Sequence, residues 1–325
     1  MPELLPKMPP HFRCGLVTII GRPNVGKSTL LNTVVGEKIA IVSKIPQTTR
    51  NQIRGIYNDE RGQIIFIDTP GLYLARLPES RKIGGQGKDK LDQLLIKSAF
   101  SSTQDVDCVI HLVDTSEATG QEEQEVVKRL STVKVPIILG LNKIDLKGKH
   151  FPQYISLWEK VRGKSVQEME NFVLLPLSGR ARKNIDKLLD IIFAFLPMGP
   201  ALYPLDAVSD VPQRIAIADI IREKFLSLMR EELPHAIAVS VETIQPKKNN
   251  VLYISAFIFV ERESQKEIVI GKRAEVLKKV GVQAREELQI LLNSKIFLDL
   301  QVKTRKKWRD DPNFLEELGL DINEQ

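Results

Sequence analysis

The stretch that most constrains the fold is Gly-Arg-Pro-Asn-Val-Gly-Lys-Ser at residues 21–28. It follows an apolar run at residues 16–20, which predicts a buried strand. It also opens an apolar-periodic segment at residues 28–35, stopped by Gly36, which predicts a helix. Glycines at this spacing let backbone N–H groups surround a phosphate, and the helix N-terminus adds partial positive charge. The stretch therefore predicts a phosphate loop, and the flanking elements disfavour an ordinary glycine turn.

Two side chains of this loop have expected roles in nucleotide chemistry. Lys27 would reach the β- and γ-phosphates of a nucleoside triphosphate, and the Ser28 hydroxyl would ligate Mg²⁺. Residues 52–57 and 63–67 predict a hairpin whose second strand ends at Asp68. A carboxylate at that strand end is well placed to hold Mg²⁺ through water.

Two further positions are expected to respond to the nucleotide. Thr49 lies in a polar segment after the loop, where a nucleotide switch would place a hydroxyl on Mg²⁺ opposite Ser28. Gly71 follows the strand that ends at Asp68. Because it has no side chain, its N–H can approach a γ-phosphate and move away after hydrolysis.

The tetrapeptide Asn-Lys-Ile-Asp at residues 142–145 ends an apolar strand predicted at residues 135–141. Guanine presents an N1–H and an exocyclic amino group, and the Asp145 carboxylate can accept both, whereas adenine presents no such pair. Unpaired buried polar groups cost about 1–3 kcal/mol each, which is enough for strong base discrimination. Asn142 is expected to brace the loops, and the Lys143 stem is expected to pack on the base.

These motifs give the set of candidate site residues. The expected nucleotide contacts are Gly21, Arg22, Pro23, Asn24, Val25, Gly26, Lys27, Ser28, Thr29, Asp68, Thr69, Pro70, Gly71, Asn142, Lys143, Asp145, Ser178 and Gly179. The expected metal ligands are Ser28, Thr49 and Asp68, and the expected switch residues are Gln47, Thr48, Thr49, Gly71 and Leu72.

The order of predicted elements indicates two domains, because 325 residues exceed one ordinary core. Strands alternate with helices, and every motif ends a strand. This predicts a mostly parallel α/β sheet of the P-loop NTPase class with helices on both faces. We expect a tail at residues 1–12, this domain at 13–197, a proline-rich linker at 198–212, a smaller α+β domain at 213–309 and an acidic tail at 310–325.

The second half carries a basic turn, Ile-Gly-Lys-Arg-Ala at residues 270–274, between two predicted helices. Such a turn can grip a nucleic-acid backbone while bases lie in the adjoining apolar groove. Residues 262–309 carry thirteen basic against six acidic side chains, whereas residues 310–325 carry six acidic and no basic ones. An ordinary α+β domain with solvated helix faces remains the alternative. The candidate RNA contacts are Arg262, Ile270, Gly271, Lys272, Arg273, Ala274, Lys278, Lys279 and Trp308.

Together these motifs resemble the Era family, bacterial ribosome-assembly GTPases with a C-terminal KH domain of type II. The resemblance covers residues 15–319 and includes Gln-Thr-Thr-Arg at 47–50, Asp-Thr-Pro-Gly-Leu at 68–72 and Trp-Arg-Asp-Asp at 308–311. It implies GTP and GDP with Mg²⁺ as ligands, binding of 16S ribosomal RNA near its 3′ end, and a role in maturation of the small ribosomal subunit. It also implies a cytoplasmic protein that can associate peripherally with the inner membrane. A monomer is expected.

Several positions depart from the family pattern. Ala274 stands where the KH turn has its second glycine, and a helical φ, which alanine tolerates, is expected there. Gly179 replaces an alanine, and the stretch at residues 74–92 is longer than usual. Leu72 occupies the place of a water-orienting glutamine, which predicts slow intrinsic hydrolysis. Asn24 is a candidate ligand for K⁺, a feature of GTPases that resemble this chain.

Composition limits the remaining choices. No apolar run approaches the roughly 20 residues that cross a bilayer, and the N-terminus lacks the apolar core of a signal peptide. Cys14 and Cys108 are expected to be small apolar fillers in a reducing compartment, and His111 a buried, hydrogen-bonded imidazole. Two alternatives stay open. One is an RNA-binding scaffold with little turnover, and the other is a related GTPase that acts on another RNA.

Overall fold

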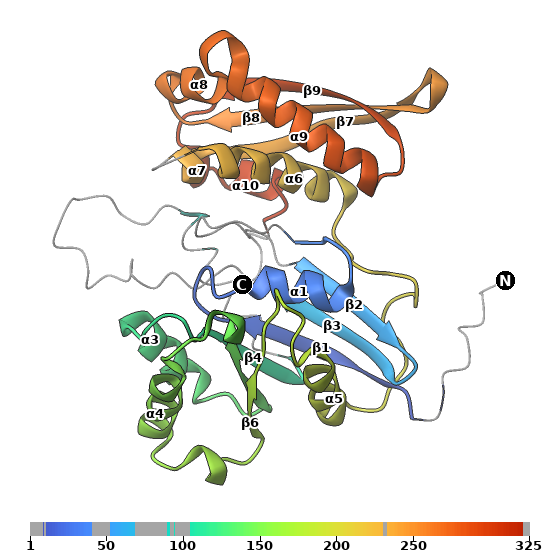
Figure 1. Ribbon diagram of the computed structural model, residues 1–325. Coiled ribbons are helices and arrows are strands. Elements are labelled where there is room, and N and C mark those ends of the chain that lie inside the picture. The colour runs from blue at the N-terminus through green and yellow to red at the C-terminus, as the bar shows by residue number, and fades with distance from the viewer. Residues whose placement is uncertain are drawn as a thin grey trace. The chain divides into compact units, whose positions relative to one another are not determined.

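The computed structural model describes residues 9, 11–40, 53–68, 90–91, 94, 105–229 and 233–320. The described residues form two compact units: residues 11–40, 53–68 and 105–210 belong to the first, and residues 211–229 and 233–320 belong to the second together with Lys90, Leu91 and Leu94. A six-stranded sheet belongs to the first unit and a three-stranded sheet to the second (Figure 1). In the part of the chain that the structure describes, no helix is both long enough and apolar enough to span a membrane.

The first unit is built on a sheet with the strand order β2-β3-β1-β4-β5-β6. β2 pairs antiparallel with β3 as the predicted hairpin, and the other neighbouring strands pair in parallel. The carboxyl ends of the parallel strands meet at one edge, which gathers Asp68, Asp114 and Asn142 there. The strands are β1 (Arg13–Ile20), β2 (Ile53–Asp59), β3 (Gly62–Asp68), β4 (Cys108–Asp114), β5 (Ile137–Asn142) and β6 (Phe172–Pro176).

Helices cover both faces of this sheet, as predicted. Val109 and Val113 of β4 pack into a buried cluster with apolar side chains of α3 and α4. On the other face, α1 packs near Gly55 of β2, and the Phe193 ring of α5 lies 6.5 Å from that of Tyr57; Figure 1 shows both helices in front of the strands. The helices are α1 (Lys27–Val35), α3 (Gln121–Leu130), α4 (Phe151–Arg162) and α5 (Ile185–Phe195).

The segment after α5 packs on the first unit through Gln63, a fully buried polar residue of β3. Its Oε1 accepts hydrogen bonds from the N–H groups of Leu202 (2.8 Å) and Tyr203 (2.9 Å), and its Nε2 donates to the Tyr203 carbonyl (2.9 Å). The Ile56 N–H donates to the Val208 carbonyl at 2.9 Å. Much of the proline-rich stretch is therefore fastened to the β2–β3 side of the sheet.

The second unit is a sheet with the order β7-β8-β9, antiparallel and then parallel, packed against α6 and α9. The sequence at residues 214–232 predicts one helix, and the end of that prediction is wrong: α6 stops at Leu228, because Met229 is extended (φ −98°, ψ 156°) and packs into the core. The elements are α6 (Gln213–Leu228), α7 (Leu233–Ala236), β7 (Ala238–Lys247), β8 (Val251–Val260), α8 (Glu263–Ile270), α9 (Glu275–Leu291), β9 (Lys295–Thr304) and α10 (Pro312–Glu317).

The acidic tail contains a helix, α10, that completes a second buried cluster. Phe314 and Leu315 of α10 pack with Trp308, Ala238 and Leu91. The predicted acidic tail thus buries apolar side chains of its described part, while Asp310, Glu316 and Glu317 are exposed.

Candidate nucleotide-binding site

The phosphate loop joins β1 to α1 with the close backbone approaches that its glycines allow. Gly26 is the N-cap of α1 in a left-handed conformation (φ 105°), and a Cβ there would lie 2.5 Å from Asn142 Nδ2. A Cβ at Gly21 would lie 2.3 Å from the Leu112 carbonyl oxygen. Both positions therefore require glycine, and the predicted phosphate cradle is built from strand, turn and helix N-terminus.

Lys27 places an ammonium inside this cradle. The residue is buried, and Nζ donates to the carbonyls of Gly21 and Arg22, each at 3.0 Å. Burial lowers the pKa of Lys27 to about 8, although the charges of Asp68 and Glu123 act in the opposite direction. A buried cation beside a helix N-terminus is stabilised by an anion, so this arrangement fits a phosphate group.

Ser28 and Asp68 lie together at the mouth of the loop. The Ser28 hydroxyl donates to Asp68 Oδ2 at 2.8 Å, and Asp68 is fully buried at the end of β3. Hydroxyl and carboxylate oxygens are the hard ligands that Mg²⁺ uses. The described residues hold no group of three His, Cys, Asp or Glu side chains suited to a metal ion. These two oxygens therefore suit a cation that takes its other ligands from phosphates and water.

Asn142 joins the phosphate loop to the candidate base-recognition loop. Its Nδ2 donates to the Val25 carbonyl at 2.7 Å, and its Oδ1 accepts from the Gly179 N–H at 3.0 Å. Lys143 adds a second tie, since its Nζ donates to the Asn24 carbonyl (2.8 Å) and to Asp114 Oδ2 (2.5 Å). These hydrogen bonds give Asn142 the geometry that bracing the two loops requires, the role that the sequence predicts for it.

Asp145 is oriented by the loop after β6. The Ser178 hydroxyl donates to Asp145 Oδ1 at 2.5 Å, which holds the carboxylate that would read a guanine edge. The neighbouring Gly179 docks on α1: its carbonyl accepts from the Thr33 hydroxyl at 2.8 Å, and a Cβ there would lie 3.2 Å from Leu30 Cα. Glycine therefore fits this position more easily than alanine would.

Sequence reasoning missed a buried network behind the phosphate loop. Arg22 Nε lies 2.6 Å from Glu123 Oε2, and Arg22 Nη2 donates to the Tyr154 hydroxyl at 2.8 Å. Glu123 Oε1 also contacts His111 Nε2 at 2.7 Å, and Trp158 Nε1 donates to His111 Nδ1 at 3.1 Å. His111 is therefore a satisfied core imidazole, as expected. The Arg22 side chain takes part in this network, while its carbonyl accepts from Lys27.

The contacts of this network determine the tautomer of His111 and shift the pKa of Arg22. Because His111 Nδ1 accepts the hydrogen bond from Trp158 Nε1, the ring proton lies on Nε2, and Nε2 donates a hydrogen bond to Glu123 Oε1. Burial lowers the pKa of Arg22, but Glu123, Tyr154 and Glu117 together raise it by more, so the net pKa of Arg22 is raised. The signal in the sequence was a histidine inside an apolar strand, but its partners on α3 and α4 were not readable from spacing.

Several predicted site residues lie outside the described part of the chain. They are the switch and metal candidates Gln47, Thr48 and Thr49, together with Thr69, Pro70, Gly71 and Leu72. The stretch at residues 74–89 also lies outside it.

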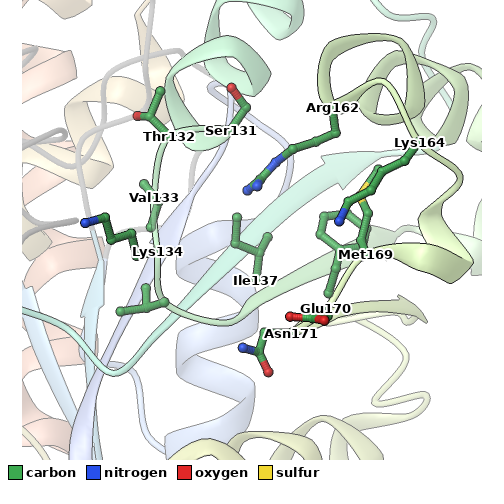
Figure 2. Close-up of a pocket in the computed structure, with 12 residues that line it drawn as sticks. Ser131, Thr132, Val133, Lys134, Ile137, Arg162, Lys164, Met169, Glu170 and Asn171 are labelled. Atoms are coloured by element: carbon green, nitrogen blue, oxygen red, sulfur yellow. The ribbon is translucent and has the colours of Figure 1, made fainter.

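A separate hollow of about 340 Å³ lies at the amino-terminal ends of β5 and β6, opposite the strand ends that carry the nucleotide motifs (Figure 2). It is lined by the segment after α3 and by the starts of β5 and β6, including Ile137 and Phe172. Figure 2 shows Arg162 and Lys164 reaching into it, while Lys134 points away. None of the predicted nucleotide contacts lines this hollow. Ligands of parallel sheets bind at the carboxyl ends of strands, so this is not the nucleotide site.

In the second unit, the basic turn links α8 to α9 with an unusual backbone. Gly271 has φ 74° and ψ 167°, and a Cβ there would lie 2.6 Å from Val276 Cγ2. Lys272 and Arg273 are exposed. Ala274 is left-handed (φ 61°, ψ 28°), so the expected right-handed helical φ is corrected: the turn survives, but with alanine in a conformation that favours glycine.

The other RNA candidates separate into two groups. Lys278 and Lys279 are exposed in the first turns of α9, next to the turn. Arg262 is also exposed but caps the far end of α8, about 12 Å away along an eight-residue helix. Trp308 is fully buried, and its Nε1 donates to the Ala236 carbonyl at 3.0 Å. The expectation that Trp308 contacts RNA is therefore corrected, because its ring is part of the core.

The fold and the two sites define the class of protein: a P-loop GTPase domain joined to a KH domain. The chain matches the family model described as 50S ribosome-binding GTPase over residues 16–143 and the KH domain model over residues 232–309. It also matches the elongation factor Tu GTP binding domain over residues 96–198.

Known proteins are similar to this chain over most of its length. GTPase Era of Carboxydothermus hydrogenoformans is 44% identical over 95% of this chain and 98% of its own, and GTPase Era of Halothermothrix orenii is 40% identical over the same shares. A crystal structure of Era with MgGDPNP and nucleotides 1506–1542 of 16S ribosomal RNA has a TM-score of 0.84 at 34% identity, covering 96% of this chain and 100% of that one. The chain belongs to the Era family of GTPases.

Proposed function

We propose that this GTPase is a slow nucleotide switch whose KH domain binds 16S ribosomal RNA near its 3′ end and assists maturation of the small ribosomal subunit. The observation that carries the proposal is the pairing of a guanine-type site, in which Asn142 braces the phosphate loop and Ser178 orients Asp145, with a basic KH turn in the same chain. The relative crystallised with 16S ribosomal RNA supports the choice of RNA.

In this proposal one set of residues binds the nucleotide, and a second set holds the Mg²⁺ that stabilises its charge. Lys27 and the N–H groups at the start of α1 hold the β- and γ-phosphates, and Asp145 accepts the two guanine donors. Ser28 and Asp68 hold Mg²⁺, which when bound neutralises phosphate charge. Thr49, Gly71 and Leu72 belong to the switch in this proposal, and leucine cannot orient water. Turnover is therefore slow, and GTP acts as a timer.

Asn24 is the proposed K⁺ ligand beside the phosphates, where a monovalent cation would supply charge that no arginine provides. Asn24 has φ 64°, and its carbonyl accepts from Lys143. We expect GTP hydrolysis to be faster in KCl than in NaCl, and the difference to disappear in Asn24→Ala. Equal rates in the two salts for the wild type would contradict this assignment.

In this proposal the protein is a cytoplasmic monomer, with peripheral association to the inner membrane as a family property. It requires no membrane-spanning helix, since basic residues of the KH domain can contact an anionic surface.

The direct test of the RNA assignment uses the exposed pair in the KH turn. Lys272→Ala combined with Arg273→Ala should weaken binding of the 16S fragment and flatten its salt dependence, because two phosphate contacts are lost. GTP affinity should stay unchanged. The same substitutions at Lys128 and Lys160, exposed on α3 and α4 of the first unit, serve as the charge-matched control. Unchanged RNA affinity in the variant of Lys272 and Arg273 would contradict the assignment of this turn as an RNA contact.

The alternative is an RNA-binding scaffold that binds nucleotide with little turnover. The intact set of Lys27, Ser28 and Asp68 disfavours it. Release of radiolabelled phosphate from GTP by the purified protein, with and without the 16S fragment, distinguishes the two.

A further inference from the structure

One face of the second sheet packs on helices, and the opposite face carries aromatic side chains. Ile254, Ala256 and Ile258 of β8 point into the core shared with α6 and α9. Because side chains alternate along a strand, Tyr253 and Phe257 lie on the opposite face. The parallel register places Phe297 of β9 beside Tyr253. We call Tyr253, Phe257 and Phe297 the aromatic face.

One end of this side of the sheet is covered, and the aromatic face is not. Phe259, two residues beyond Phe257, packs edge-on against the Phe314 ring of α10 at 4.8 Å. At the other end Phe297 is 60% exposed, and Tyr253 and Phe257 are partly exposed. The domain thus covers part of Phe259 with α10, while the neighbouring Tyr253, Phe257 and Phe297 have no ring contact with α10 among those of the described residues.

The accessible rings are held in a fixed orientation. Tyr253 and Phe297 are nearly parallel, with 19° between their planes and 5.8 Å between centroids. The Tyr253 hydroxyl donates to Asp299 Oδ2 at 3.1 Å, which fixes that ring. A platform whose rings are already ordered loses little conformational entropy when a flat ligand stacks on it.

Cations accompany the rings. Lys247 Nζ lies 5.4 Å from the Tyr253 ring centroid, and Lys303 Nζ lies 3.0 Å from that of Phe257. Lys295 is exposed on β9, two residues before Phe297 and on the same face. Fixed rings with ammonium groups beside them suit single-stranded RNA, in which bases stack and phosphates need positive charge. An acidic peptide would use the lysines but not the parallel rings.

We propose that the aromatic face binds single-stranded RNA by stacking bases on Tyr253, Phe257 and Phe297, as a second RNA-contact surface apart from the turn at residues 271–274. The inference rests on the proposed RNA-binding function and extends it to the side of the sheet away from α8 and α9. Gln245 and Gln301, exposed in the same rows as Tyr253 and Phe257, provide hydrogen-bonding groups for base edges.

The test uses the full-length protein and a fluorescein-labelled RNA with the sequence of nucleotides 1506–1542 of 16S ribosomal RNA. Phe297→Ser should weaken binding about tenfold, the typical effect of losing one base–aromatic stack, and Phe297→Trp should retain affinity. Ile290→Ser is the matched control, because Ile290 is 84% exposed on α9. It should bind as the wild type does. Ultraviolet crosslinking with 4-thiouridine in the RNA should mark Tyr253 or Phe297.

Each outcome separates this inference from the function on which it rests. If Phe297→Ser binds as tightly as the wild type and crosslinks map elsewhere, the aromatic face is not an RNA surface. Loss of binding in the double variant of Lys272 and Arg273 would then still support the turn. If the wild-type protein does not bind this RNA, the proposed function fails first. If Phe297→Ser alters only self-association, measured by sedimentation, the face is an interface between copies and the inference is overturned.

Discussion

Lys27 shows how the fold prepares one side chain for a ligand. In the unfolded chain the ammonium has its ordinary pKa of 10.5, and burial in the phosphate loop lowers the folded value to about 8. The folded state therefore disfavours the charged form. This penalty is fully present below pH 8 and disappears as the pH rises toward 10.5. Phosphate oxygens would offset the same penalty by stabilising the charge.

The first prediction concerns the pH dependence of nucleotide binding. Phosphates favour charged Lys27, so binding should take up a proton when Lys27 is partly neutral, and GDP affinity should fall as the pH rises above about 8. Calorimetry in buffers of different ionisation enthalpy, at pH 7 and pH 8.5, measures the uptake. Guanosine, which lacks phosphates, is the control ligand and should show none. Equal proton uptake for both ligands would contradict the role of Lys27.

Ala274 has a strained backbone conformation in the KH turn, which lowers the stability of the folded protein. Its left-handed φ of 61° brings the alanine Cβ too close to its own backbone, a strain that glycine does not have. Ala274→Gly should raise the free energy of unfolding by about 1 kcal/mol, net of the entropy that glycine loses on folding. Urea denaturation measures the change.

The control for that experiment is Gly281→Ala, because Gly281 lies within α9 and a Cβ there meets only Leu300 Cδ1, at 3.7 Å. It should also stabilise the protein, by a helix-propensity gain of similar size. A loss of stability in Ala274→Gly, beside a gain in Gly281→Ala, would show that the turn is not strained.

At the scale of elements, α3 and α4 support the phosphate loop through Arg22, which contacts Glu123 of α3 and Tyr154 of α4. The carboxylate is fully buried between Arg22 and His111. Removing one partner of a buried ion pair leaves the other charge uncompensated, which costs roughly 3–5 kcal/mol. A loop tied in this way keeps its N–H groups in place before the nucleotide arrives.

Glu123→Gln should therefore destabilise the protein by about 3 kcal/mol and weaken GDP binding. Glu125→Gln is the matched control on the same helix. Glu125 pairs at the surface with Arg129 (3.1 Å), and such pairs contribute no more than about 1 kcal/mol. Denaturation and GDP titration of both variants give the comparison. Similar effects of the two substitutions would mean that the buried network does not support the loop.

The elements also show which parts of the structure the sequence could reveal. The charged stretch at residues 121–130 predicts a helix, and α3 has these bounds; the hairpin, the parallel strands and the positions of the motifs at strand ends are also confirmed. These features depend on local periodicity and on strand order. The end of α6 at Leu228 was missed because no glycine or capping residue marks it.

The helix α10 was missed although its signals are local. Asp311 caps it by accepting the Phe314 N–H at 3.3 Å, Pro312 opens it, and Gly319 follows it with φ 82°. The acidic composition of the tail obscured these signals. The burial of Trp308 and the Glu123 network could not be predicted, because each depends on contacts between residues far apart in sequence.

At the scale of the molecule, one chain joins a GTPase unit to a KH unit, and the segment between them is fastened to the first unit by Gln63. A switch that times RNA binding requires that the nucleotide change the affinity for RNA. Linkage then requires that RNA change the affinity for the nucleotide by the same factor.

The most direct test of this account is the affinity of the full-length protein for the 16S fragment with a non-hydrolysable GTP analogue and with GDP. We expect the two affinities to differ by at least about fivefold, the lower end of typical allosteric coupling. The reciprocal measurement, the ratio of GTP-analogue to GDP affinity with and without RNA, should change by the same factor. Equal RNA affinity in both nucleotide states would contradict the account and leave a GTPase and an RNA-binding domain that act independently.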